Sequence, residues 1–202
     1  MKTNLSDFII KYDSVLTPDF CKEVCIKMDN DNRKKDGVTA GGVKKEVKNT
    51  VDLNISPYND WKDTDSVFFH KVSMFIEIYM QDLKDKSYID INEILDFLGD
   101  PKYAISDSGY QIQKYSTGGK YVWHHDYILN QRNGTRVLTY LFYLNDDFEG
   151  GETEFSDGTI IKPRTGTLLI FPSTWVYLHR GKEVTKGEKY IATGWLSHKL
   201  KN

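Results

Sequence analysis

The sequence predicts a mainly β protein with N-terminal helices, in which the strands form either a barrel or a double-sheet jelly roll. Apolar residues recur at helical spacing only in the first half of the chain. From Gly109 onward, short alternating segments are separated by glycine and asparagine. No helix-length segment separates these later strands, so a parallel α/β sheet is excluded.

Length and charge limit the class of protein. The 202 residues suffice for one sizeable core, so we expect a single domain, with residues 1–108 as a support region and residues 109–198 as the β-rich core. A net charge of -2 gives no field that attracts a polyanion, and nucleic acid is not an expected partner. The sequence gives no indication of an oligomeric state.

No membrane partner is expected, because the sequence has no apolar run of about 18 residues. The first ten residues, "MKTNLSDFII", are too short and too acidic for a signal sequence. These two observations predict a cytoplasmic protein.

The first half of the chain supplies the helices. Residues 7–16 are apolar and β-branched, which predicts a strand, and a threonine–proline pair then begins a helix over residues 17–28. Helical spacing predicts a long helix over residues 65–83 and a further one over residues 91–98. The polar, glycine-containing residues 30–48 are expected to form a mobile loop.

Several potential ligands have simpler interpretations. Cys21 and Cys25 lie four apart on a predicted helix, which indicates one buried face rather than a disulfide or a metal pair. His70 lies on the long helix, where a core or surface histidine is the expected role. His125 and His198 are expected at the surface.

The stretch "YSTGGKYVWHHDY" contains two histidines and an aspartate. In an extended segment alternate residues share a face, so His124 and Asp126 point together and His125 points away. A third ligand must come from elsewhere, and His179, 55 residues downstream of His124, is the candidate. Two imidazoles and one carboxylate on one face of a metal form the facial triad of ferrous oxygenases.

Lys189 follows His179 by ten residues and shares its strand face with Ile191, Thr193 and Trp195. A lysine among inward-pointing residues needs an anion as partner. A dicarboxylate co-substrate bound at the metal would supply one through its far carboxylate.

Five segments in order, "YSTGGKYVWHHD", "RVLTYLFYLND", "GGETEFSDG", "IKPRTGTLLIFP" and "HRGKEVTKGEKYIATGWL", resemble the 2-oxoglutarate and iron(II)-dependent dioxygenases, particularly the prolyl 4-hydroxylase branch. The resemblance covers nearly all of residues 109–196. It implies a double-stranded β-helix, a jelly-roll and cupin-like core, with Fe(II) held by His124, Asp126 and His179. The presence of Asp126 favours hydroxylation over halogenation, because related halogenases have a small residue there.

The resemblance also implies how the co-substrate is held. Lys189 would bind the distal carboxylate of 2-oxoglutarate, and Tyr115 and Tyr143 match tyrosines that contact the co-substrate in the family. Thr139 shares its strand face with Tyr143 and is expected in the same pocket. Dioxygen is then the second substrate, and ascorbate the reductant.

The activity that the resemblance implies is hydroxylation of a prolyl residue in a peptide or protein, so the expected partner is a proline-containing peptide. Residues 30–48 are long enough to close over such a chain. The alternatives are a hydroxylase of a free amino acid or another small molecule, and a metal- or peptide-binding module without turnover. Glu183 stands where the family often has proline, which bears on substrate preference rather than on the reaction.

Overall fold

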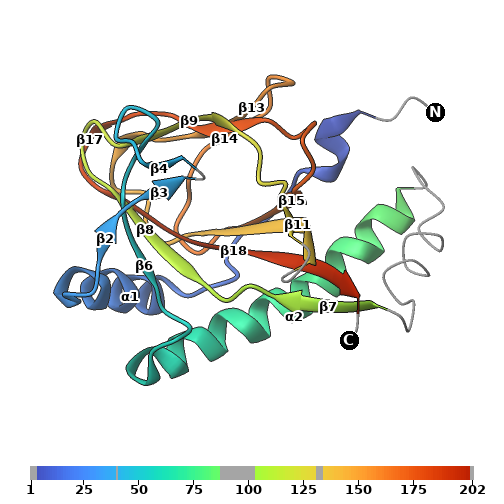
Figure 1. Cartoon of the computed structure of the whole chain (residues 1–202), viewed down its shortest axis with the longest axis horizontal. Helices are drawn as coiled ribbons and strands as arrows, with labels where there is room; N and C mark the ends of the chain where they lie inside the picture. Colours follow the sequence, from blue (N-terminus) through green and yellow to red (C-terminus); the bar gives the residue numbers. More distant parts are fainter. Residues whose placement is uncertain (1–3, 40, 87–102, 131–133, 201–202) are drawn as a thin grey trace.

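The computed structural model describes residues 4–39, 41–86, 103–130 and 134–200. Two antiparallel sheets face each other, and two helices cover the outer face of the larger sheet (Figure 1). The helix expected over residues 91–98 lies outside the described residues.

Helix α1 (Pro18–Asn30) begins as the sequence predicts, because the hydroxyl of Thr17 accepts a hydrogen bond from the Phe20 backbone N–H at 3.3 Å. Helix α2 (Lys62–Asp85) is the long scaffold helix. The 3-10 helix η2 (Asn59–Trp61) leads directly into α2.

The prediction of a strand over residues 7–16 is largely wrong. The 3-10 helix η1 (Leu5–Phe8) occupies its first part, and only β1 (Ile10–Tyr12) is extended. The carboxylate of Asp7 accepts a hydrogen bond from the Asn4 backbone N–H, which stabilises the 3-10 turn and shortens the strand.

The larger sheet is antiparallel throughout, and its strands come from both halves of the chain. In spatial order they are β1, β15 (Leu168–Pro172), β11 (Gly134–Tyr143), β18 (Lys189–Leu200), β8 (Gln111–Tyr115), β6 (Val51–Asn54) and β2 (Lys35–Asp36), with β10 (Leu129–Asn130) paired to β11 and β7 (Tyr103–Asp107) paired to β18.

The smaller sheet faces it and carries two of the predicted metal ligands. Its order is β14 (Ile160–Ile161), β13 (Thr153–Phe155), β16 (His179–Gly181), β9 (Lys120–His124) and β5 (Lys48–Asn49). Two further two-stranded sheets flank these, one of β12 (Glu149–Gly150) with β17 (Val184–Lys186) and one the hairpin of β3 (Val38–Thr39) with β4 (Gly42–Val43). The predicted mainly β fold with a double-stranded β-helix core is confirmed.

Alternation along β11 divides the core into two layers. Tyr140 and Phe142 point toward the helices, where Phe68 of α2 packs against Phe142 with ring centroids 5.1 Å apart. Leu141 and Tyr143 point into the space between the two sheets. The sheet is therefore buried on both faces, which explains the nearly continuous apolar run in this strand.

The prediction that residues 30–48 form a mobile loop is wrong. The segment contains β2 and the first residue of β5, and these strands pair with β6 and β9. Lys48 fixes the C-terminal end of residues 30–48. Its ammonium group is buried and forms an ion pair of 2.6 Å with Asp52. A polar composition did not predict this, because the partner carboxylate lies on the next strand.

The remaining expectations for individual residues have mixed outcomes. Cys21 is fully buried on α1 and Cys25 half-buried, and both are free thiols, as their helical spacing predicted. His70 and His125 are exposed, but His198 is buried, so its surface assignment is wrong. Strand β18 continues past residue 196 and places His198 between β11 and β7.

Among the described residues, no helix is long and apolar enough to cross a membrane.

Candidate metal and co-substrate site

The structure brings His124, Asp126 and His179 together between the two sheets. Their potential ligand atoms all lie within 4.8 Å of one another. The carboxylate oxygens of Asp126 lie 3.8 Å from Nε2 of each histidine. Three residues separated by up to 55 positions therefore converge on one point, as the sequence predicted.

A β-bulge in β9 orients the first histidine. His124 is opposite His179 and Tyr121 is opposite Gly181, so β9 has one more residue than β16 between these two pairs. Because of this extra residue, Tyr121 and His124 face the same cavity, and their rings stack with centroids 3.5 Å apart. Simple alternation would have placed them on opposite faces.

Backbone carbonyls fix the tautomer of both histidines. Nδ1 of His124 lies 2.8 Å from the Val122 carbonyl oxygen, and Nδ1 of His179 lies 3.0 Å from that of Tyr177. A carbonyl only accepts, so each Nδ1 carries the hydrogen and each Nε2 presents its lone pair to the space beside Asp126. This is the tautomer that a metal ligand requires.

The carboxylate of Asp126 is held in its ionised form. The Thr139 hydroxyl on β11 donates a hydrogen bond to Oδ2 of Asp126 at 2.9 Å. Burial acts to raise the pKa of this carboxyl, but His179 and His124 outweigh it and hold the pKa below its ordinary value. Burial, and then the proximity of His179, lowers the pKa of His124 to about 3, so that imidazole is neutral.

Two imidazoles and one carboxylate suit a divalent transition metal such as Fe(II), and the donor atoms occupy one face only. The residues present therefore fit the metal that the resemblance implies. Crystals of the protein could hold another divalent metal here, because the general affinity order does not favour iron.

A small cavity of about 50 Å³ extends from the three ligands into the space between the sheets. Lys189 lines the same cavity and is only 2% exposed, and its Nζ donates a hydrogen bond to the Gly151 carbonyl oxygen at 2.7 Å. Among the described residues, no carboxylate lies within ion-pair distance of this ammonium group. Burial lowers the pKa of Lys189 to about 7. A dianion in the cavity would therefore gain a desolvated cationic partner.

The predicted co-substrate residues lie at different depths. Tyr115 and Thr139 line the cavity, and Nζ of Lys189 lies 4.9 Å from the Tyr115 ring centroid. Tyr143 packs 5.7 Å from the same Nζ, but its hydroxyl donates to Thr153 at 2.7 Å. Tyr143 thus lies behind Thr153, and its contact with a co-substrate stays a prediction.

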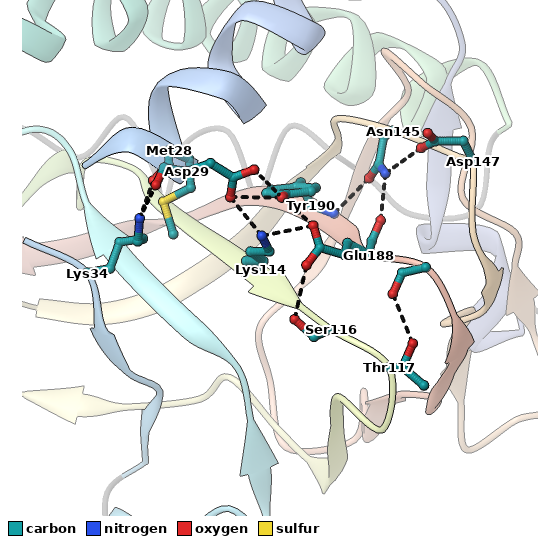
Figure 2. A network of polar contacts seen from close by, with 11 residues as sticks. Met28, Asp29, Lys34, Lys114, Ser116, Thr117, Asn145, Asp147, Glu188 and Tyr190 are labelled. Carbon is teal, nitrogen blue, oxygen red and sulfur yellow. Dashed lines mark hydrogen bonds and ion pairs between the residues drawn. The ribbon is translucent and has the colours of Figure 1, made fainter. Parts of the chain in front are cut away.

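A polar network lies on the opposite face of β8 and β18, the two strands that carry Tyr115 and Lys189. Lys189 is opposite Tyr115 in the β8–β18 register, and their neighbours Tyr190 and Lys114 point to the other face. Figure 2 shows Lys114 and Tyr190 converging on Asp29 at the end of α1. Lys114 also pairs with Glu188 at 2.9 Å, so the network holds the strands in register against the helix.

Beside the metal ligands a wider cavity of about 590 Å³ opens to the surface, and we call it the mouth. Val38 and Thr39 of β3 form one side, and Arg136 and Trp195 form another. The guanidinium carbon of Arg136 lies 3.5 Å from the Trp195 ring centroid. Trp195, for which packing was the expected role, lines both cavities.

Sequence reasoning missed the other residues of the mouth. Arg136 is the one cation in the apolar segment "RVLTYLFYL", which is a signal that could have identified it. Lys48 and Gln113 also line the mouth, and Gln113 lines the inner cavity as well. Nothing in the local sequence distinguishes them from solvated strand residues.

The part of the chain that forms this site is similar to a known protein family. Residues 110–197 match the family model described as the 2OG-Fe(II) oxygenase superfamily. Over these residues, which make up less than half of the chain, the protein is similar to that superfamily. The matched region includes the three predicted metal ligands, Tyr115 and Lys189.

Prolyl 4-hydroxylase 1 of Arabidopsis thaliana is 35% identical to this protein over 114 residues, which is 44% of this chain and 40% of the relative. The alignment thus spans well under half the length of that relative. The resemblance to prolyl 4-hydroxylases that the sequence motifs indicated is confirmed.

Solved structures support the fold. A Trichoplax adhaerens prolyl hydroxylase in complex with a hypoxia inducible factor peptide fragment superposes with a TM-score of 0.68 at 18% identity, over 95% of this chain and 84% of that one. A Pseudomonas putida prolyl-4-hydroxylase gives a TM-score of 0.63 at 17% identity, over 96% of each chain.

Proposed function

We propose that this protein is a 2-oxoglutarate- and Fe(II)-dependent dioxygenase that hydroxylates a prolyl residue in a peptide or protein. The observation that carries the proposal is the shared cavity, which is lined both by the three predicted metal ligands and by a buried lysine that has no ion-pair partner among the described residues. Fe(II) with 2-oxoglutarate and dioxygen supplies the oxidising power for an unactivated C–H bond. The protein supplies the geometry described below.

His124, Asp126 and His179 would hold the metal from one side, and this leaves the side facing the cavity for the co-substrate and dioxygen. Lys189 would pair with the far carboxylate of 2-oxoglutarate and so fix the direction in which the molecule lies. The cavity walls exclude water from that pair, which strengthens it. Ordered binding of this kind converts the reaction into a step between positioned groups.

The mouth supports a peptide as substrate. It adjoins Asp126, and its volume of about 590 Å³ exceeds the inner cavity of about 50 Å³ more than tenfold. The flat face of Trp195, backed by Arg136, suits an apolar ring such as that of proline. The hairpin β3–β4 borders the same cavity and would contact residues that flank the reacting one.

The test incubates the protein with Fe(II), ascorbate and 2-oxoglutarate, together with proline-containing peptides of differing flanking charge or with free L-proline. We expect succinate formation that one class of peptide stimulates, and mass spectrometry should find a single added oxygen on its proline. Turnover stimulated by free proline alone, with every peptide unmodified, would support the small-molecule alternative. Metal binding without any succinate formation would support a non-catalytic module.

A further inference from the structure

A line of hydrogen bonds joins the inner cavity to the mouth. The Tyr115 hydroxyl donates to Oε1 of Gln113 at 2.7 Å, and Nε2 of Gln113 donates to Oε1 of Gln111 at 2.6 Å. Nε2 of Gln111 then donates to Oδ1 of Asn54 at 3.0 Å. Every donor in this line points the same way, from the inner cavity toward the surface. We call these four residues the amide ladder.

The ladder crosses from one cavity to the other. Tyr115 lines only the inner cavity, Gln113 lines both, and Gln111 and Asn54 line only the mouth. Tyr115 and Gln113 are 3% and 5% exposed, while Asn54 is exposed. The strands β8 and β6 hold the ladder in place, because Gln111 is directly opposite Asn54 in their register. Water therefore has little access to Tyr115 and Gln113, and each of them donates a hydrogen bond to the next residue of the ladder.

The direction of the ladder matters for an anion in the inner cavity. A tyrosine hydroxyl has one hydrogen, and in this structure it is given to Gln113. A carboxylate only accepts, so it cannot bond to Tyr115 until that hydrogen turns toward it. A side-chain amide has both a donor and an acceptor, and rotation of each amide by half a turn reverses the whole line without losing a bond.

We propose that Gln113 and Gln111 are positioning residues that set the direction of the Tyr115 hydroxyl hydrogen and thereby couple the mouth to co-substrate binding. The inference rests on the proposed function, since it takes 2-oxoglutarate as the anion. In the reversed ladder, Nε2 of Gln113 donates to the Tyr115 oxygen, and the hydroxyl donates to the carboxylate. Oδ1 of Asn54 then faces the mouth, so a main-chain N–H at that position favours the reversed state.

The decisive variant is Gln111→Glu. An ionised glutamate has no hydrogen to give, so Nε2 of Gln113 must donate to it and Oε1 of Gln113 must keep the Tyr115 hydrogen. We expect calorimetric titration of 2-oxoglutarate into the Mn(II)-loaded protein to give a dissociation constant weaker by about tenfold, the loss of one charge-assisted hydrogen bond. Gln111 does not line the inner cavity, so the effect must pass through Gln113.

Gln113→Met breaks the ladder and serves as the background. In the Gln113→Met background, adding Gln111→Glu should change the dissociation constant of 2-oxoglutarate by less than about threefold. The negative charge at position 111 is still present, but its hydrogen-bond connection to Tyr115 is lost. Gln81→Glu, on the exposed face of α2, is the matched charge control. Thermal unfolding of each variant checks the fold.

Two results would overturn the inference. One is an unchanged affinity in Gln111→Glu, and the other is an equal weakening in the Gln113→Met background, which would assign the effect to charge through space. If the unaltered Mn(II)-loaded protein failed to bind 2-oxoglutarate, the proposed function itself would fail, and the titration separates that outcome from the others.

Discussion

His124 and His179 lie directly opposite each other on β9 and β16, and their ring centroids are 4.2 Å apart. This cross-strand pair explains how residues far apart in the sequence present Nε2 atoms to one carboxylate. Each ring is fixed through Nδ1 by the backbone carbonyl of the residue two positions earlier in the chain. The backbone thus sets the orientation of both rings toward the carboxylate of Asp126.

Removing one histidine should abolish metal binding. His179→Ala leaves two ligands, and we expect Mn(II) affinity measured by calorimetry to fall by more than about 100-fold, beyond what loss of an outer hydrogen-bonding partner costs. His125→Ala is the control, because His125 is exposed beside the site. If His179→Ala bound Mn(II) as tightly as the control, the assignment of this ligand would be wrong.

Replacing the buried lysine should weaken co-substrate binding without weakening the fold. Lys189→Met removes a charge-assisted hydrogen bond to 2-oxoglutarate, which corresponds to a loss of affinity on the order of 10- to 100-fold. The unfolding temperature should stay equal or rise, because the variant no longer buries an ammonium group. Lys186→Met, on an exposed position of β17, should change neither quantity. An unchanged 2-oxoglutarate affinity in Lys189→Met would refute the role of this residue.

The same lysine should make 2-oxoglutarate binding depend on pH. Burial lowers its pKa to about 7 from the ordinary 10.5, so above pH 7 the group must take up a proton when the dianion binds. Affinity should then fall by up to about tenfold per pH unit above pH 7. Titrations in buffers with different ionisation enthalpies measure the proton uptake directly, and Lys189→Arg should remove the dependence.

The stability that Lys189 contributes should change with pH in the opposite direction to the affinity for 2-oxoglutarate. Its pKa in the folded protein lies below that of the unfolded chain, so the unfolded chain binds more protons between about pH 7 and 10.5. The free energy of unfolding contributed by this group should therefore rise with pH across that window. The difference between unaltered protein and Lys189→Met in urea unfolding isolates the contribution, and a difference independent of pH would contradict it.

Breaking the buried ion pair beside the mouth should destabilise the protein strongly. Lys48→Met leaves the carboxylate of Asp52 buried with only Thr50 as hydrogen-bond donor, which costs about 3–5 kcal/mol of unfolding free energy. Lys45→Met, which breaks the exposed pair with Asp36, should cost less than about 1 kcal/mol. Equal losses in the two variants would show that burial of the Lys48–Asp52 pair has no special effect.

Acid should reduce the loss of unfolding free energy that Lys48→Met causes. Burial raises the pKa of Asp52 above its ordinary value even beside Lys48, and without the lysine this carboxyl binds a proton still more readily. A folded-state pKa above the unfolded value means that stability from this group is present at low pH and lost as pH rises. Urea unfolding at pH 4 and pH 7 measures the difference.

The sequence by itself determined much of the fold and the choice of the three candidate metal ligands. Helix α1 begins at its threonine–proline pair, and the C-terminal strands follow their alternating apolar segments, because these signals act between near neighbours. His124, Asp126 and Lys189 could also be selected locally, since their spacing on extended segments fixes the face on which they lie. The need for a third ligand pointed to His179, and the motif resemblance added the family.

Only the tertiary structure decided the features that depend on two distant strands. The bulge that brings Tyr121 beside His124 arises from the pairing of β9 with β16. The buried pair of Lys48 and Asp52, and the amide ladder from Tyr115 to Asn54, depend on side chains meeting across β5, β6 and β8. Such contacts leave no periodic signal in one segment, because a buried polar side chain is stabilised by a partner whose position is set by sheet register.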